Sequence, residues 1–170
     1  AAYAGLSEWR NYMEFEHPQG RVAIATSGDP VVIDEHPFFQ PIGTNGRACV
    51  TCHQPADAMS LSLRTIKSRW EEHGYRDPLF DPIDGSNCPT STQEQRQSHS
   101  LLLERGLIRI SLPWPPRDLD GRPIEPEFTL EVVADPTGCN SGSSHGPAAK
   151  TPHISVYRRP RMTANLRYIL

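Results

Sequence analysis

One short motif brings together residue types that can carry covalent chemistry. Cys49 and Cys52 stand three positions apart and His53 follows directly, in the order Cys-Val-Thr-Cys-His. Two thiols at this spacing can add to the two vinyl groups of one porphyrin, and the next residue then places an imidazole under the iron. In such a site Nε2 binds the iron, while Nδ1–H donates to a carbonyl that fixes the ring. The motif therefore predicts one covalently bound haem c, with His53 as its proximal ligand.

Two other chemistries use similar cysteine spacings. A thioredoxin-like redox pair needs a strand-to-helix context in a compact α/β pattern, which this sequence does not show. A zinc site needs two more ligands at similar spacing, whereas Cys88 and Cys139 stand alone in turn-like segments. A chance match is the remaining alternative. We therefore take covalent haem attachment as the leading interpretation.

A haem that carries electrons needs a second axial ligand, usually Met or His. Met162 is the first candidate, because it lies in a proline-flanked loop well after His53. Three histidines in loops or at a helix end are the alternatives: His73, His145 and His153. The sixth ligand could also come from outside this sequence.

Arg47 directly precedes the motif and could pair with a haem propionate, since guanidinium groups bind carboxylates in a fork.

The cysteines outside the motif indicate the compartment. Cys88 and Cys139 are the two cysteines left after the motif is set aside, and in an exported protein such a pair favours a disulfide over two buried free thiols. The sequence begins Ala1-Ala2-Tyr3, a start that removal of a signal peptide would leave. We therefore expect a periplasmic or extracellular protein whose signal peptide has been removed.

Composition limits the partners and the fold. The net charge is -3 and there is no basic run, so nothing indicates nucleic acid or anionic lipid as a partner. No stretch approaches the ~20 apolar residues of a membrane span. Apolar residues make up 36% of the chain, beside 17 prolines and 12 glycines, which favours a loop-rich fold. A bound haem would add apolar surface around which such a thin core can pack.

The elements that must position these residues can be predicted from pattern. Apolar spacing with capping residues predicts helices at Ser7–Phe15, Ser60–His73 and Gln93–Arg105. Alternating residues at Leu107–Leu112 and Phe128–Val133 predict a β-hairpin, inserted at about residues 107–134 with a long proline-rich tip. Short extended segments are predicted at Val22–Ala25, Pro30–Ile33 and Ile154–Tyr157. We expect a mainly α, cytochrome c-like haem domain with long loops, a single domain over residues 1–170.

The stretch from His36 to Pro55 resembles the first haem site of the di-haem cytochrome c peroxidase family, in which Asn-Gly and a small residue lead into the haem cysteines. Weaker similarity continues at Asp84–Pro89, at Leu107–Arg109 and from Tyr157 to Arg167. The resemblance implies the N-terminal haem domain of that family. Its members use two haems for peroxidase chemistry, whereas this sequence holds one Cys-x-x-Cys-His motif.

These observations predict a c-type cytochrome that binds one haem and transfers single electrons, rather than an enzyme by itself. Its partner would be a redox protein or a further haem subunit. Two alternatives stay open. The chain could be a peroxidase-like haem domain, which would make it part of a cytochrome c peroxidase-like oxidoreductase. It could also be a structural subunit whose haem conducts electrons within a larger complex.

Overall fold

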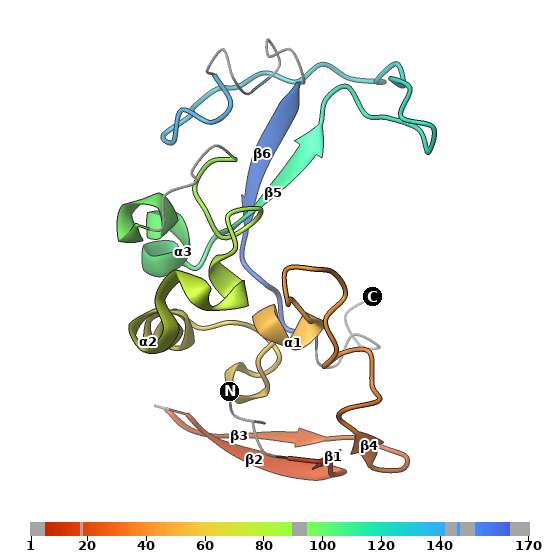
Figure 1. The fold of residues 1–170 in the computed structure, drawn as a ribbon, viewed down its shortest axis with the longest axis vertical. Coiled ribbons are helices and arrows are strands. Elements are labelled where there is room, and N and C mark those ends of the chain that lie inside the picture. Colours follow the sequence, from red (N-terminus) through yellow and green to blue (C-terminus); the bar gives the residue numbers. More distant parts are fainter. Residues whose placement is uncertain (1–5, 18, 90–94, 142–145, 147–151, 164–170) are drawn as a thin grey trace. The chain divides into compact units, whose positions relative to one another are not determined.

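The computed structural model describes residues 6–17, 19–89, 95–141, 146 and 152–163 (Figure 1). The chain divides into two compact units, which we call the first unit (residues 1–79 and 159–170) and the second unit (residues 80–158). The single domain expected over residues 1–170 stays a prediction, because two compact units can belong to one domain.

Antiparallel strand pairs form the N-terminal part of the first unit. Strand β1 (Glu8–Trp9) pairs with β4 (Val31–Val32), and β2 (Tyr12–His17) pairs with β3 (Gly20–Ala25) in a register that places Tyr12 opposite Ala25. Trp9, Phe15 and Ile33 form the core between them, with the Trp9 and Phe15 rings stacked at 5.6 Å. The extended segments expected around β3 and β4 are confirmed.

The helix expected at Ser7–Phe15 is wrong. In β2 the apolar Met13 and Phe15 alternate with Glu14 and Glu16, and Phe15 is buried while both glutamates are exposed. This period of two fits a strand with one buried face. Trp9 and Met13 also lie four positions apart, so the same residues satisfied a helical pattern, and pairing with β3 decided between the two.

The first unit continues with α1 (Cys49–Cys52), the 3-10 helix η1 (Pro55–Asp57) and α2 (Leu63–His73). The expected helix at Ser60–His73 is confirmed, but it begins later. Ser62, not Ser60, caps α2, because its side chain accepts a hydrogen bond from the Thr65 amide. Gly74 ends the helix as predicted. The 3-10 helices η2 (Gly74–Arg76) and η3 (Pro78–Phe80) come next.

The second unit contains the 3-10 helix η4 (Arg96–His99), α3 (Ser100–Arg105), and strands β5 (Ile108–Pro113) and β6 (His153–Arg158). Helix α3 covers the end of the helix expected at Gln93–Arg105 and stops at Gly106, which has a positive φ of 66°. A disulfide joins Cys88 to Cys139, as expected, with a Cα–Cα distance of 5.4 Å.

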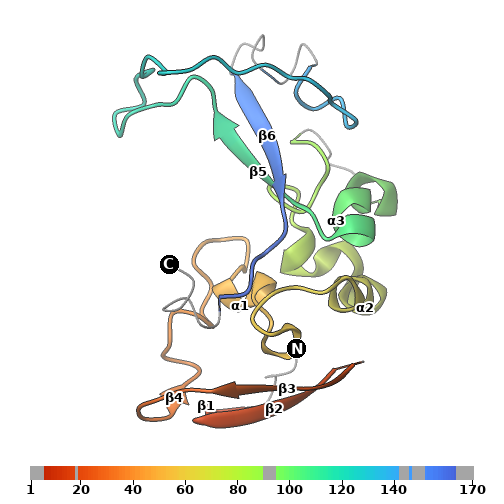
Figure 2. The same cartoon turned by 180° about the vertical axis from the view of Figure 1, so that it is seen from behind.

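The prediction of a β-hairpin at about residues 107–134 is right in its first strand but wrong in the strand that pairs with it. Strand β5 pairs antiparallel with β6, from Ile108 opposite Arg158 to Pro113 opposite His153. Figures 1 and 2 show this pair as two long adjacent arrows. Residues 128–133 lie in no strand, and Phe128 and Val133 are largely exposed, whereas Ile154 of β6 is buried. Burial therefore selected β6 as the partner.

The expected mainly α, cytochrome c-like fold is contradicted. The described residues form three short α-helices, several 3-10 turns and three separate two-stranded antiparallel sheets. Proline removes a backbone donor and disfavours helix in the residue before it, so a chain with 17 prolines supports few long helices.

Candidate haem site

The two motif cysteines lie on one turn of helix. Cys49 and Cys52 begin and end α1, neither forms a disulfide, and both are of intermediate exposure. Residues three apart share one face of a helix, so the two thiols are neighbours on one side. Val50 and Thr51, between them, are 1% and 6% exposed. The helix is therefore embedded through Val50 and Thr51, while its cysteines stay accessible.

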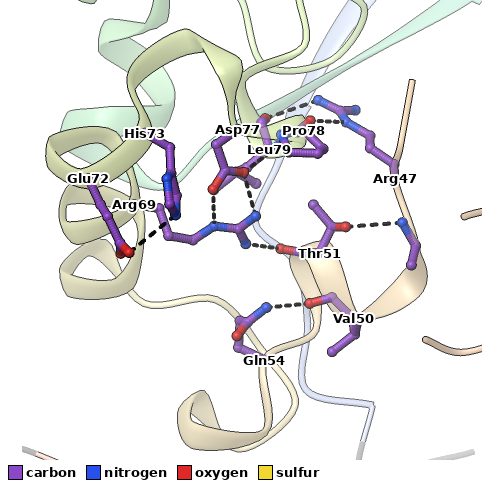
Figure 3. Close-up of polar contacts among 11 residues, drawn as sticks. Arg47, Val50, Thr51, Gln54, Arg69, Glu72, His73, Asp77, Pro78 and Leu79 are labelled. Carbon is purple, nitrogen blue, oxygen red and sulfur yellow. Dashed lines mark hydrogen bonds and ion pairs between the residues drawn. The ribbon is translucent and has the colours of Figure 1, made fainter. Parts of the chain in front are cut away.

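Main-chain contacts hold this turn in place. The Val50 amide donates to the Phe38 carbonyl at 3.1 Å, and the Ala48 amide donates to Thr51 Oγ1 at 3.0 Å. Arg69, on α2, donates from Nη1 to the Thr51 carbonyl at 2.7 Å (Figure 3). The helix has only four residues and needs such external partners, because its terminal amides and carbonyls have none within the helix.

His53 directly follows α1, and its ring is fixed from behind. Nδ1 lies 3.0 Å from the Met59 carbonyl oxygen, so Nδ1 carries the hydrogen and donates. In the neutral form of such a ring the lone pair is on Nε2, which is the nitrogen that can bind iron. The carbonyl partner expected for the ring is therefore present, and it comes from only six residues further along the chain.

The Met59 carbonyl belongs to a closed turn that we call the proximal loop, residues 54–60. The Gln54 amide donates to the Ser60 carbonyl at 2.7 Å, and the Met59 amide donates back to the Gln54 carbonyl at 2.9 Å. The Gln54 side chain, 3% exposed, donates from Nε2 to the Val50 carbonyl of α1. The loop that holds His53 is thereby joined to the helix that holds the cysteines.

Two successive residues of the proximal loop adopt left-handed backbone conformations. Ala58 has φ 55° and Met59 has φ 61°, and neither is a glycine. Each such residue costs about 1–2 kcal/mol, because Cβ approaches the following carbonyl oxygen. This strain is concentrated at the residue whose carbonyl meets His53, and strained backbone of this kind is often found at functional sites.

A buried ion pair lies beside α1. Arg69 donates from Nε to Asp77 Oδ2 at 2.8 Å and also pairs with Oδ1 through Nη2, and the two side chains are only 19% and 5% exposed. Asp77 Oδ1 also accepts from the Leu79 amide at 2.9 Å. Sequence reasoning missed this pair. Its only local sign is a carboxylate eight positions after an arginine, which is too common to be informative.

Arg47 contacts carbonyl groups of its own unit. Its Nε donates to the Pro78 carbonyl at 2.7 Å, and its Nη2 donates to the Leu79 carbonyl at 3.0 Å (Figure 3). These bonds join the segment before the motif to the segment after α2. The expected contact between Arg47 and a haem propionate stays a prediction.

The candidates for the sixth ligand lie in different places. The amide of Thr163, the residue after Met162, donates to the Met59 carbonyl at 3.3 Å, so the chain passes the proximal loop there. His73 ends α2, and its half-exposed ring lies 3.4 Å from the Glu72 carboxylate (Figure 3). His153 opens β6 in the second unit. His145 lies outside the described residues.

The chemistry of Cys49, Cys52 and His53 suits a covalently bound haem. Within the described part of the chain, no group of three or more His, Cys, Asp or Glu side chains could hold a metal ion. Zinc needs about four protein ligands. A porphyrin supplies four nitrogens itself, so the chain need provide only two accessible thiols and an oriented imidazole, and α1 with His53 provides these.

Comparisons with protein-family models, with curated proteins and with solved structures found no match for this chain. Among the described residues, no helix has both the length and the apolar character that a membrane crossing requires.

Proposed function

We propose that this chain is a c-type cytochrome unit that binds one haem through Cys49, Cys52 and His53 and passes single electrons to a partner. One observation carries the proposal. Two accessible thiols share a helical turn, and the adjoining imidazole has Nδ1 committed to the Met59 carbonyl. Two thiols at this spacing are what covalent haem attachment requires, and a ring with its hydrogen on Nδ1 can bind iron through Nε2.

Each residue has a defined task in this proposal. Addition of a thiol S–H across a vinyl group forms one C–S bond and places the hydrogen on the other vinyl carbon, so attachment consumes no oxidant. The Nδ1–H bond to Met59 holds the His53 ring and raises its basicity as a ligand. When bound, the haem supplies one-electron redox chemistry.

The disulfide supports export, because such bonds persist mainly in oxidising compartments. We therefore propose a periplasmic or extracellular location. An electron carrier there passes electrons to a redox protein or to a further haem subunit. Peroxide reactivity of the haem-loaded chain would instead favour the peroxidase-like alternative.

Haem attachment in a host that matures c-type cytochromes tests the proposal. The full chain should gain the mass of one haem and keep it under denaturing conditions, as read by mass spectrometry and by haem staining. The double variant Cys49→Ala, Cys52→Ala should hold no covalent haem.

The matched control is Cys88→Ala, Cys139→Ala, which also removes two cysteines but should keep the covalent haem. A correctly exported wild-type chain without covalent haem would refute the proposal. Equal attachment in both double variants would refute the assignment of the cysteines.

A further inference from the structure

The segment Pro160–Thr163, which we call the clasp, contacts the proximal loop at two successive residues. Ser60 Oγ donates to the Pro160 carbonyl at 2.7 Å, and the Thr163 amide donates to the Met59 carbonyl at 3.3 Å. About a hundred residues separate Ser60 from Pro160 in sequence, and the four residues joined by these two bonds belong to the first unit. The clasp therefore ties the end of the described chain to the loop that holds His53.

Met59 is the centre of this arrangement. Its carbonyl oxygen accepts from both His53 Nδ1 and the Thr163 amide, which its two lone pairs allow. Its left-handed φ and that of Ala58 need support from outside the loop, because strained backbone persists only where neighbouring contacts determine it. The hydrogen bond from Ser60 to Pro160 and the hydrogen bond from Thr163 to the Met59 carbonyl supply such support.

The shared carbonyl also places the clasp relative to the imidazole. The Thr163 amide belongs to the peptide that joins it to Met162, and it reaches the oxygen bound by His53 Nδ1. The backbone at Met162 is therefore on the Nδ1 side of the ring. If the site holds a haem, His53 would bind its iron through Nε2, at the opposite edge of the ring from the Met162 backbone, and the remaining iron ligand would have to come from another residue or from a partner.

We infer that the clasp is a positioning device that holds the Met59 carbonyl against His53 and keeps Met162 on the proximal side, so that Met162 is not the sixth haem ligand. Ser60 is the positioning residue, and it acts through Met59. The inference rests on the proposed haem site. It reverses the sequence-based preference for Met162 and leaves the sixth position to a histidine or to a group from a partner.

The first test uses the haem-loaded full chain with Ser60→Ala, Ser60→Thr and, as a control on the exposed side of α2, Ser68→Ala. Loosening the clasp weakens the hydrogen bond from Nδ1 and so reduces electron donation to the ferric iron. We expect Ser60→Ala to keep its covalent haem, to raise the midpoint potential and to shift the EPR g-values. Ser60→Thr, which keeps the hydroxyl, and Ser68→Ala should match the wild type.

Amide hydrogen exchange provides a second readout that does not depend on the iron. Exchange at Thr163 should be roughly fivefold faster in Ser60→Ala, the factor expected for the loss of about one hydrogen bond. Wild-type exchange and wild-type potential in Ser60→Ala would overturn the clasp. Equal potential shifts in Ser60→Ala and Ser60→Thr would overturn the role of the hydroxyl.

Met162→Leu tests the ligand assignment. We expect its visible and EPR spectra to match the wild type, and loss of a thioether-to-iron charge-transfer band would overturn the inference. The two hypotheses fail separately. A wild-type chain without covalent haem defeats the proposed function, whereas a haem-loaded chain in which Ser60→Ala changes nothing defeats only the clasp.

Discussion

Main-chain carbonyls position the side chains that matter most around the candidate site. His53 is held by the carbonyl of Met59, Arg69 reaches the carbonyl of Thr51, and Arg47 contacts the carbonyls of Pro78 and Leu79. Every residue carries such an acceptor. The identity of the partner therefore leaves no mark in the sequence, and only the fold reveals it.

Contacts made by the fold also set the ionisation of Asp135 in the second unit. Partial burial raises its pKa, but hydrogen bonds from Ser141, Asn140 and Thr137 lower it more, so the pKa of Asp135 lies below its ordinary value. The folded protein therefore favours the carboxylate form. The resulting stability is present at neutral pH and is lost as the pH falls through the ordinary and then the folded pKa.

Asp135→Asn should remove this pH-dependent contribution. We expect the variant to be less stable than the wild type at neutral pH, and the difference to shrink below the ordinary aspartate pKa of about 3.9. Urea unfolding at the two pH values measures it. Asp120→Asn, at an ion pair that is 70% exposed on the aspartate side, is the control and should change little at either pH. A pH-independent loss in Asp135→Asn would contradict the expectation.

At the level of elements, short helices are held by contacts that link one to the next. Helix α2 caps itself through Ser62 and supplies Arg69, which bonds both to α1 and to Asp77. The 3-10 helix η1 lies within the proximal loop, and the Gln54 side chain of the same loop donates to α1. The Cys-x-x-Cys-His motif is therefore positioned by a series of contacts between neighbouring elements rather than by one long helix.

Asp77→Ala should break the strongest of these links. It leaves the Arg69 guanidinium largely buried without its carboxylate, and removing one partner of a buried pair costs about 3–5 kcal/mol. We expect a loss near the lower end of that range in urea unfolding, because Arg69 keeps its bond to Thr51. Glu16→Ala, whose side chain is 87% exposed and pairs with Arg21, is the control and should change stability by less than about 0.5 kcal/mol. Equal effects would show that the buried pair contributes no more than a surface pair.

At the scale of the whole molecule, few regular elements are combined with a covalent link. The described residues hold three short α-helices and three small sheets, and the disulfide closes a loop of 51 positions within the second unit. Long irregular segments bury little apolar surface, so a link that restricts the unfolded chain contributes a large share of stability.

Cys88→Ala combined with Cys139→Ala should lower the free energy of unfolding by about 4 kcal/mol, the loop-entropy value for this separation. Urea unfolding of the haem-free chain measures the change. Cys49→Ala combined with Cys52→Ala removes two thiols without opening a loop, and it is the matched control. A loss of similar size in the control would assign the effect to the removal of sulfur rather than to the disulfide.

The sequence by itself determined what local sterics and spacing decide. The spacing of Cys49 and Cys52 matches one helical turn, and His53 follows at the end of that turn. Gly74 and Gly106 end helices because glycine tolerates a positive φ. The pairing of Cys88 with Cys139 followed from the even remainder of cysteines. The haem, the electron transfer and the sixth ligand stay predictions from the same motif.

Only the tertiary structure decided which distant segments meet. The pattern at Ile108–Pro113 indicated a strand, but burial of Ile154 selected β6 over residues 128–133 as its partner. The Tyr12–His17 segment satisfied helix and strand patterns together until pairing with β3 resolved it. The Met59 carbonyl and its contacts with His53 and Thr163 had no sequence signal, because a main-chain acceptor is the same at every residue and only the path of the folded chain brings it to its donors.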